Sequence, residues 1–204
     1  MSAETAHPAD DLQFIRRILE RTQARIDPHA FHFVLWGALV FVAYPLGNWF
    51  DLKGRGDLRG WTIGGMLAAG ALASFLFEFR LRGRSRLEGE NTFVSRQVVQ
   101  LVFYHIGVAS FLSAAGPASE FVPGPFVPHV WGFAYASMMY TIGVVYTREY
   151  VAAGFAILVG TAIALFNVRY AGMILGPFMG LGAIIPGVIA ERRVARLRAE
   201  SAAA

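Results

Sequence analysis

The polar side chains that could carry chemistry are few, and they lie inside long apolar stretches. A polar group is costly in a bilayer, so each one is a candidate for function. They are Gln97, Gln100, His105, Ser110, Ser113, Ser137, Thr141 and Thr161. No serine has a base at a catalytic spacing, no GxSxG or HExxH motif occurs, and no paired carboxylates lie within an apolar stretch. The sequence therefore predicts no catalytic residue and a non-enzymatic protein.

His105 is the strongest of these candidates, because it lies about 12 Å into its apolar stretch at 1.5 Å per residue. Three roles stay open for it: a hydrogen bond to a Tyr or Ser, a substrate or proton site, and a haem ligand. A haem would need a second histidine at matching depth, but His32 lies near one membrane surface and His129 near the other. Cysteine is absent, so thiolate metal ligands are excluded. We therefore predict no cofactor and no metal.

Aromatic residues offer a second kind of site, for a small solute that is bound or transported. Rings with few hydrogen-bonding groups suit a flat, weakly polar ligand, and a quinone electron carrier is a related alternative. The residues expected to line such a site are Trp36, Tyr44, His105, Trp131, Tyr135 and Tyr140. A proton-coupled transporter would want a carboxylate near the midplane, and the sequence has none there.

The composition indicates that membrane-spanning helices position these residues. Of 204 residues, 55% are hydrophobic and 16% are charged, against about 25% charged in soluble domains. Six apolar runs are each long enough to cross a hydrocarbon core of about 30 Å. They cover residues 31–50, 61–77, 98–115, 130–146, 150–166 and 171–190. The sequence predicts an all-α polytopic membrane protein with six transmembrane helices in a domain of residues 29–191.

The two ends of the chain flank this domain with basic residues. Within residues 1–28, an Arg-rich amphipathic helix over 10–26 is expected to lie on the membrane surface. Residues 192–204 form a basic segment. With six spans, 14 of the 18 Lys and Arg residues share the side of both termini, and the other side has Lys53, Arg55, Arg59 and Arg169. This distribution predicts cytoplasmic termini in a bacterial inner membrane. It also explains the net charge of +4 by the bilayer surface rather than by nucleic acid.

Small residues at intervals of four predict where helices approach closely, because packing must drive association in lipid. The last span has Gly172, Gly176 and Gly180, and the fifth has Ala156, Gly160 and Ala164. A third stripe, in the second span, has Gly60, Gly64 and Ala68. The simplest arrangement nests these stripes against the bulky residues of the first, third and fourth spans.

The fourth span echoes the first. Trp36-Gly37 and Tyr44–Gly47 in the first span have counterparts in Trp131-Gly132 and Tyr140–Gly143. A three-span unit repeated once would be inverted in the membrane, and inverted repeats bring the midpoints of their spans together around a central site. Chance in an aromatic, Gly-rich sequence is the alternative.

Three stretches, DLQFIRRILERTQ, VWGFAYASMMYTIG and MGLGAIIPGVIAERR, together resemble an uncharacterised group of small six-span bacterial inner-membrane proteins. The size and layout are also similar to the substrate-binding subunits of energy-coupling-factor vitamin transporters. The first resemblance implies topology and no chemistry. With a basic cytoplasmic face and no charge inside the spans, we expect an accessory or regulatory subunit. Its partners would be the lipid bilayer and other membrane subunits or further copies of itself.

Overall fold

In a computed structural model, the described part of the chain, residues 30–85 and 93–203, is helical except for short connections. The predicted amphipathic helix of residues 10–26 lies outside these residues. The helices are α2 (Ala30–Leu52), α3 (Gly56–Ser85), α4 (Phe93–Ala118), α5 (Val127–Val145), α6 (Arg148–Leu165) and α7 (Ala171–Ala203). Two short 3-10 helices, η1 (Gly124–Phe126) and η2 (Val168–Tyr170), precede α5 and α7. The predicted all-α class is confirmed.

Five of the helices have the length and apolar composition of membrane spans: α2, α3, α4, α6 and α7. The protein is therefore a membrane protein by the character of its helices. The exception is α5, which contains Trp131, Tyr135 and Tyr140 together with His129. Indole, phenol and imidazole groups count as polar on a hydropathy scale even where their rings are buried, and this places α5 outside the five candidate spans.

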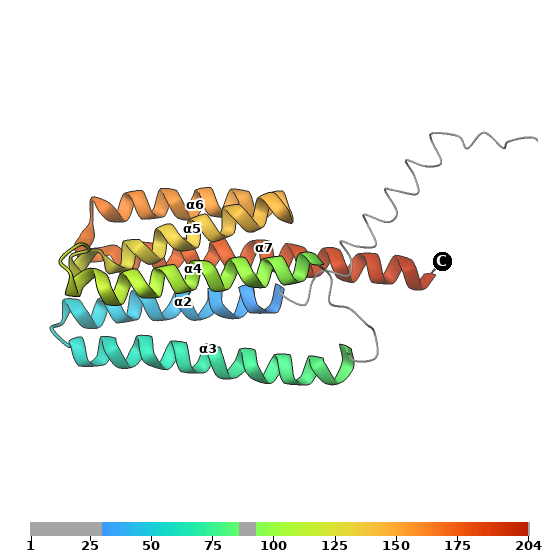
Figure 1. Cartoon of the computed structure of the whole chain (residues 1–204), viewed down its shortest axis with the longest axis horizontal. Helices are drawn as coiled ribbons and strands as arrows, with labels where there is room; N and C mark the ends of the chain where they lie inside the picture. Colours follow the sequence, from blue (N-terminus) through green and yellow to red (C-terminus); the bar gives the residue numbers. More distant parts are fainter. Residues whose placement is uncertain (1–29, 86–92, 204) are drawn as a thin grey trace, which may run out of the picture.

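The six helices run side by side along one axis, and consecutive helices point in opposite directions (Figure 1). The centre is formed by α2, α5, α6 and α7: α7 packs against α2, α5 and α6, and α5 packs against α6. The other two helices lie at the edge, α3 against α2 and α4 against α5. Residues on α3 and α4 are correspondingly exposed along most of their length.

Backbone approaches backbone where α2 meets α7. A Cβ atom added at Gly37 would lie 2.7 Å from the carbonyl oxygen of Gly180, and one added at Gly180 would lie 2.8 Å from that of Gly37. Further along, Gly172 lies against Asn48, and Gly176 lies against Pro45. The glycine stripe of α7 is thus filled by α2, which explains why these two helices form the closest pair.

Only part of the stripe predicted on α6 is buried. Gly160 lies against Phe178 of α7, and Ala164 is fully buried, but Ala156 is exposed. Positions spaced four apart turn by about 40° per step around an α-helix, so the stripe leaves the α7 side of the helix. There Ala153 and Ile157 are buried instead.

The packing does not confirm the inverted repeat. In such a repeat α3 and α4 would correspond to α6 and α7. The second pair packs closely, whereas α3 and α4 lie at separate edges of the described bundle. Likewise α2 packs against α7 and α3 rather than extensively against α5.

Several helices extend beyond their predicted spans, and α3 and α7 do so by the most residues. α3 begins at Gly56 rather than near residue 61, and Asp57 lies in its first turn, where a carboxylate is favourable. α7 continues without a break to Ala203, so the segment from 192 extends the last span as a helix that projects beyond the bundle (Figure 1). A hydropathy pattern predicts where a helix leaves the hydrocarbon core of the membrane. It does not predict where the backbone hydrogen bonding of the helix ends.

Asn48 of α2 caps the start of α7 from across the chain. Its Oδ1 accepts a hydrogen bond from the backbone N–H of Met173 at 3.1 Å, and its Nδ2 donates to the carbonyl of Arg169 at 3.0 Å. The first N–H groups of a helix lack intrahelical partners, so this side chain satisfies one of them.

Asn48→Ala is expected to lower the free energy of unfolding by about 1 kcal/mol, as loss of a helix cap does. Unfolding in mixed detergent micelles, followed by circular dichroism, measures this change. Asn48→Asp keeps the acceptor and loses the donor, so it should lie between Asn48→Ala and the wild type. Equal stability of all three proteins would contradict the capping role.

Candidate functional site

The six residues predicted to line an aromatic site do not come together at one place. Tyr44 of α2 and Tyr135 of α5 both pack against the buried core. Trp131 lies one turn from Tyr135 and packs against the same buried core. Tyr140 is 45% exposed on another side of α5, where its ring meets Phe155 edge-on. The central group is therefore Tyr44, Trp131 and Tyr135.

His105 of α4 is tied to α5. Its Nδ1 lies 2.8 Å from the carbonyl oxygen of Leu101, and its Nε2 lies 3.2 Å from Oγ of Ser137. A carbonyl can only accept, so Nδ1 carries the proton and Nε2 accepts from the serine hydroxyl. This is the Tyr-or-Ser hydrogen bond that the sequence left open as one of three roles. An axial haem bond at Nε2 would have to replace the contact with Ser137.

The contact between His105 and Ser137 should be worth about 1 kcal/mol, the net value of a typical hydrogen bond between side chains. A double-mutant cycle with His105→Leu, Ser137→Ala and both changes measures that coupling as a free energy of unfolding. Changes that simply add would show that the two side chains do not stabilise each other.

A second histidine–serine contact joins α2 to the edge helix α3. Ser74 Oγ accepts a hydrogen bond from Nε1 of Trp36 and lies 3.2 Å from Nδ1 of His32. The Phe77 ring packs edge-on against His32, and the indole of Trp36 lies over Gly70, where a Cβ would be 2.6 Å away. Trp36 thus holds α3 in place and lies apart from the tyrosines at the centre.

His129, near the start of α5, is only 2% exposed, and neither of its ring nitrogens has a hydrogen-bond partner in the part of the chain that the structure describes. The Phe126 ring of η1 lies 5.4 Å from the imidazole, centroid to centroid. A buried polar group without a partner costs stability. His129 therefore lowers the stability of the fold at the end of the bundle opposite the projecting part of α7.

The outward side of α4 combines polar and aromatic groups. Buried residues of α4, such as Val98 and Ala109, mark the side that faces the bundle. On the other side the exposed residues are Gln100, Phe103, Tyr104, Gly107, Ser110 and Phe111; Tyr104 is 66% exposed. We call this set the α4 face. Tyr104 and Ser110 lie well inside the candidate span Gln97–Ala118, where lipid offers a hydroxyl no partner.

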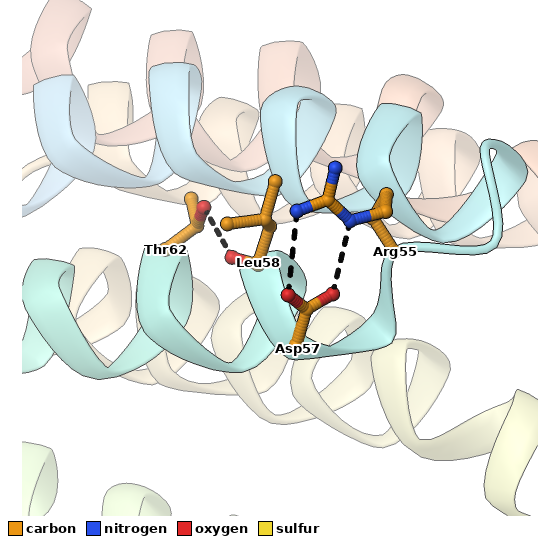
Figure 2. A network of polar contacts seen from close by, with 4 residues as sticks. All are labelled: Arg55, Asp57, Leu58 and Thr62. Atoms are coloured by element: carbon orange, nitrogen blue, oxygen red, sulfur yellow. Dashed lines mark hydrogen bonds and ion pairs between the residues drawn. The ribbon is translucent and has the colours of Figure 1, made fainter.

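Ion pairs lie at the two ends of the helices. Glu149 at the start of α6 pairs with Arg193 of α7, which holds the projecting part of α7 against α6. At the opposite end, Arg59 pairs with Asp51 at 3.1 Å. Next to it, Arg55 pairs with Asp57 across the first turn of α3 (Figure 2).

Sequence reasoning missed Ser74 and Asn48 as partners, and no local signal could have found them. Ser74 is 42 residues from His32, and Asn48 is 125 residues from Met173. Within residues 30–85 and 93–203, no three His, Asp or Glu side chains gather as a metal site would need.

Comparison with known proteins identifies no relative of the chain. No protein-family model, no curated protein and no solved structure matches the chain. The resemblance to six-span bacterial proteins therefore remains an expectation, and the function must be argued from the described side chains.

Proposed function

We propose that this is a six-span protein of the bacterial inner membrane, with cytoplasmic termini, that serves as a non-enzymatic accessory subunit of a larger membrane assembly. The sixth span is α5. Its 19 residues reach about 28 Å at 1.5 Å per residue, and α4, α6 and α7 surround it. Neighbouring protein rather than lipid meets its buried side chains, so a lower hydropathy is tolerated.

The orientation follows from basic residues at the ends of the helices. Arg192, Arg193 and Arg196 are exposed on the projecting part of α7. Of the basic residues that the structure describes, only Lys53, Arg55, Arg59 and Arg169 lie at the opposite end of the helices. Positive residues accumulate on the cytoplasmic side of membrane proteins, so the projecting end of α7 is assigned to the cytoplasm.

The observation that carries the accessory role is the α4 face. Polar side chains at membrane depth almost always face protein or a water-filled cavity. Other polar groups of the bundle do so: His105 contacts Ser137, Ser74 contacts Trp36, and Thr161 is fully buried. Tyr104 and Ser110 instead point away from the described bundle. A helix of another membrane subunit would supply their hydrogen-bond partners.

Site-specific photo-crosslinking tests this role. A photoreactive residue at Tyr104 should capture one defined membrane protein in native membranes, and Ser110→Ala with Gln100→Leu should reduce that product. The matched control is Val159 of α6, 55% exposed, where only lipid is expected and no protein product should form. A monodisperse protein that captures the same products from both positions, or none, would contradict the accessory role.

A small-solute site is a second candidate, favoured by the packing of Tyr44, Trp131 and Tyr135 against one buried core. Vitamins, quinones and lipids can be screened by thermal shift, because a ligand of the native state stabilises it in proportion to occupancy. Trp131→Ala and Tyr44→Phe should abolish the shift. Flat curves across these compounds would count against such a site.

A further inference from the structure

The buried polar atoms that lack a partner gather at one end of the protein. Within residues 30–85 and 93–203, they are Oγ of Ser113 and the two ring nitrogens of His129. Ser113 lies in the last third of α4, and His129 lies in the first turn of α5. The short helix η1 lies between them in the chain. Both side chains therefore belong to the end opposite the projecting part of α7, which we call the outer end.

Ser113 and His129 lie at the same level of the bundle. The contact between His105 and Ser137 fixes the register of α4 and α5, which run in opposite directions and pack against each other. Ser113 follows His105 by eight positions, and His129 precedes Ser137 by eight. At 1.5 Å per residue, each lies about 12 Å from that contact, towards the outer end.

The imidazole of His129 lies at the amino terminus of α5. Its ring centroid is 5.4 Å from that of Phe126, the residue that immediately precedes the helix. Side chains on an α-helix tilt towards its amino terminus, which accounts for this position. The first N–H groups of a helix lack intrahelical partners and carry a partial positive charge. No acidic residue lies in the first turn of α5, and no side chain caps it, so the imidazole lies beside N–H dipoles that no described side chain neutralises.

The chemistry of these groups favours an anion. The Ser113 hydroxyl can donate, and the imidazole can donate from one nitrogen when neutral and from both when protonated. Arg169 adds positive charge at the same end. It is exposed on η2, which contacts η1, and makes no ion pair with another described residue. The one acidic residue between α4 and α5, Glu120, is exposed and bonds to neither Ser113 nor His129.

We propose that the outer end of α5 binds a small monovalent anion such as chloride, held by Ser113 and His129 beneath η1. The polar atoms of both side chains are buried, which excludes a large anion, and a single charge limits the cost of removal from water. Phe126, beside the imidazole, is 38% exposed, so a displacement of η1 opens the route from water. This site goes beyond the accessory role, and either can fail without the other.

Anion-dependent stability tests the site in the full chain, purified in a neutral detergent. Chloride is exchanged for gluconate at constant ionic strength, and thermal unfolding is followed by circular dichroism. A ligand of the native state stabilises it with the logarithm of its concentration above Kd. The wild type should therefore unfold at a higher temperature in chloride than in gluconate, which is too large to enter. Ser113→Ala removes one hydrogen bond to the anion and should raise the chloride concentration needed by at least about tenfold.

His129→Leu should lose the chloride dependence altogether. In gluconate it should be more stable than the wild type, because leucine buries no polar atom, and chloride should narrow this difference. His105→Leu is the matched control, because the imidazole of His105 already contacts Leu101 and Ser137. That variant should keep the full chloride dependence. A wild type that unfolds at the same temperature in chloride and in gluconate, or a chloride dependence that His129→Leu retains, would overturn the proposal.

Discussion

Gly180→Leu is expected to lower the free energy of unfolding by about 3 kcal/mol, the upper end for overpacking of a core. A Cβ at this position would lie 2.5 Å from Cβ of Phe41 and 2.8 Å from the carbonyl oxygen of Gly37. Backbone atoms of α2 cannot move aside as a flexible side chain could. The two helices would have to separate, and α7 would lose the main surface that holds it.

Reversible unfolding with increasing sodium dodecyl sulfate in mixed micelles, followed by circular dichroism, measures this loss. Gly107→Leu is the matched control, because a Cβ at Gly107 of α4 meets no atom of residues 30–85 and 93–203 within 4 Å. That variant should be as stable as the wild type or slightly more stable, since leucine is the better helix former. Similar losses in both variants would show that the contact between α2 and α7 is not decisive.

His129→Leu is expected to change stability in the opposite direction, raising the free energy of unfolding by about 1–3 kcal/mol. Both ring nitrogens of His129 are buried without a partner among the described residues, so native His129 carries a desolvation cost that leucine lacks. Leucine has a similar volume and suits the neighbouring Phe126.

The same unfolding assay provides the measurement, and His129→Gln provides the control, because glutamine keeps buried polar atoms and should bring no gain. Ser113→Ala removes the other described buried side-chain group without a partner, Ser113 Oγ, and should stabilise by less. If His129→Leu destabilises the protein, the imidazole has a partner at that end of the bundle, and His129 becomes a candidate binding residue.

Prediction of the helices from the sequence succeeded because it rests on a local property. Each predicted apolar run corresponds to one helix, from α2 at Ala30–Leu52 to α7 starting at Ala171. The ends were less accurate where a helix continues into water, as α7 does past residue 190. Hydropathy changes at the membrane surface, but backbone hydrogen bonding continues wherever the residues favour it, as Ala and Arg do there.

The candidate site was less predictable, because it depends on how the helices are arranged. Trp36 and Trp131 occupy similar positions in their spans, yet Trp36 contacts Ser74 of α3 while Trp131 packs into the central core. The echo between the two spans reflects sequence similarity and does not specify which neighbour each helix meets. His105 and Ser137, 32 residues apart, could be paired only once α4 was placed against α5.

The sequence by itself determined that this chain forms long apolar helices, because twenty or so apolar residues can satisfy their backbone in lipid only as a helix. It also determined where small residues allow close approach. Only the tertiary structure decided which stripes are used: Gly172, Gly176 and Gly180 are filled by α2, whereas no described residue lies against Gly60 or Gly64. The two stripes have the same spacing and the same chemistry. What separates them is the shape of the helix that packs beside each one, and that depends on the whole bundle rather than on any local stretch.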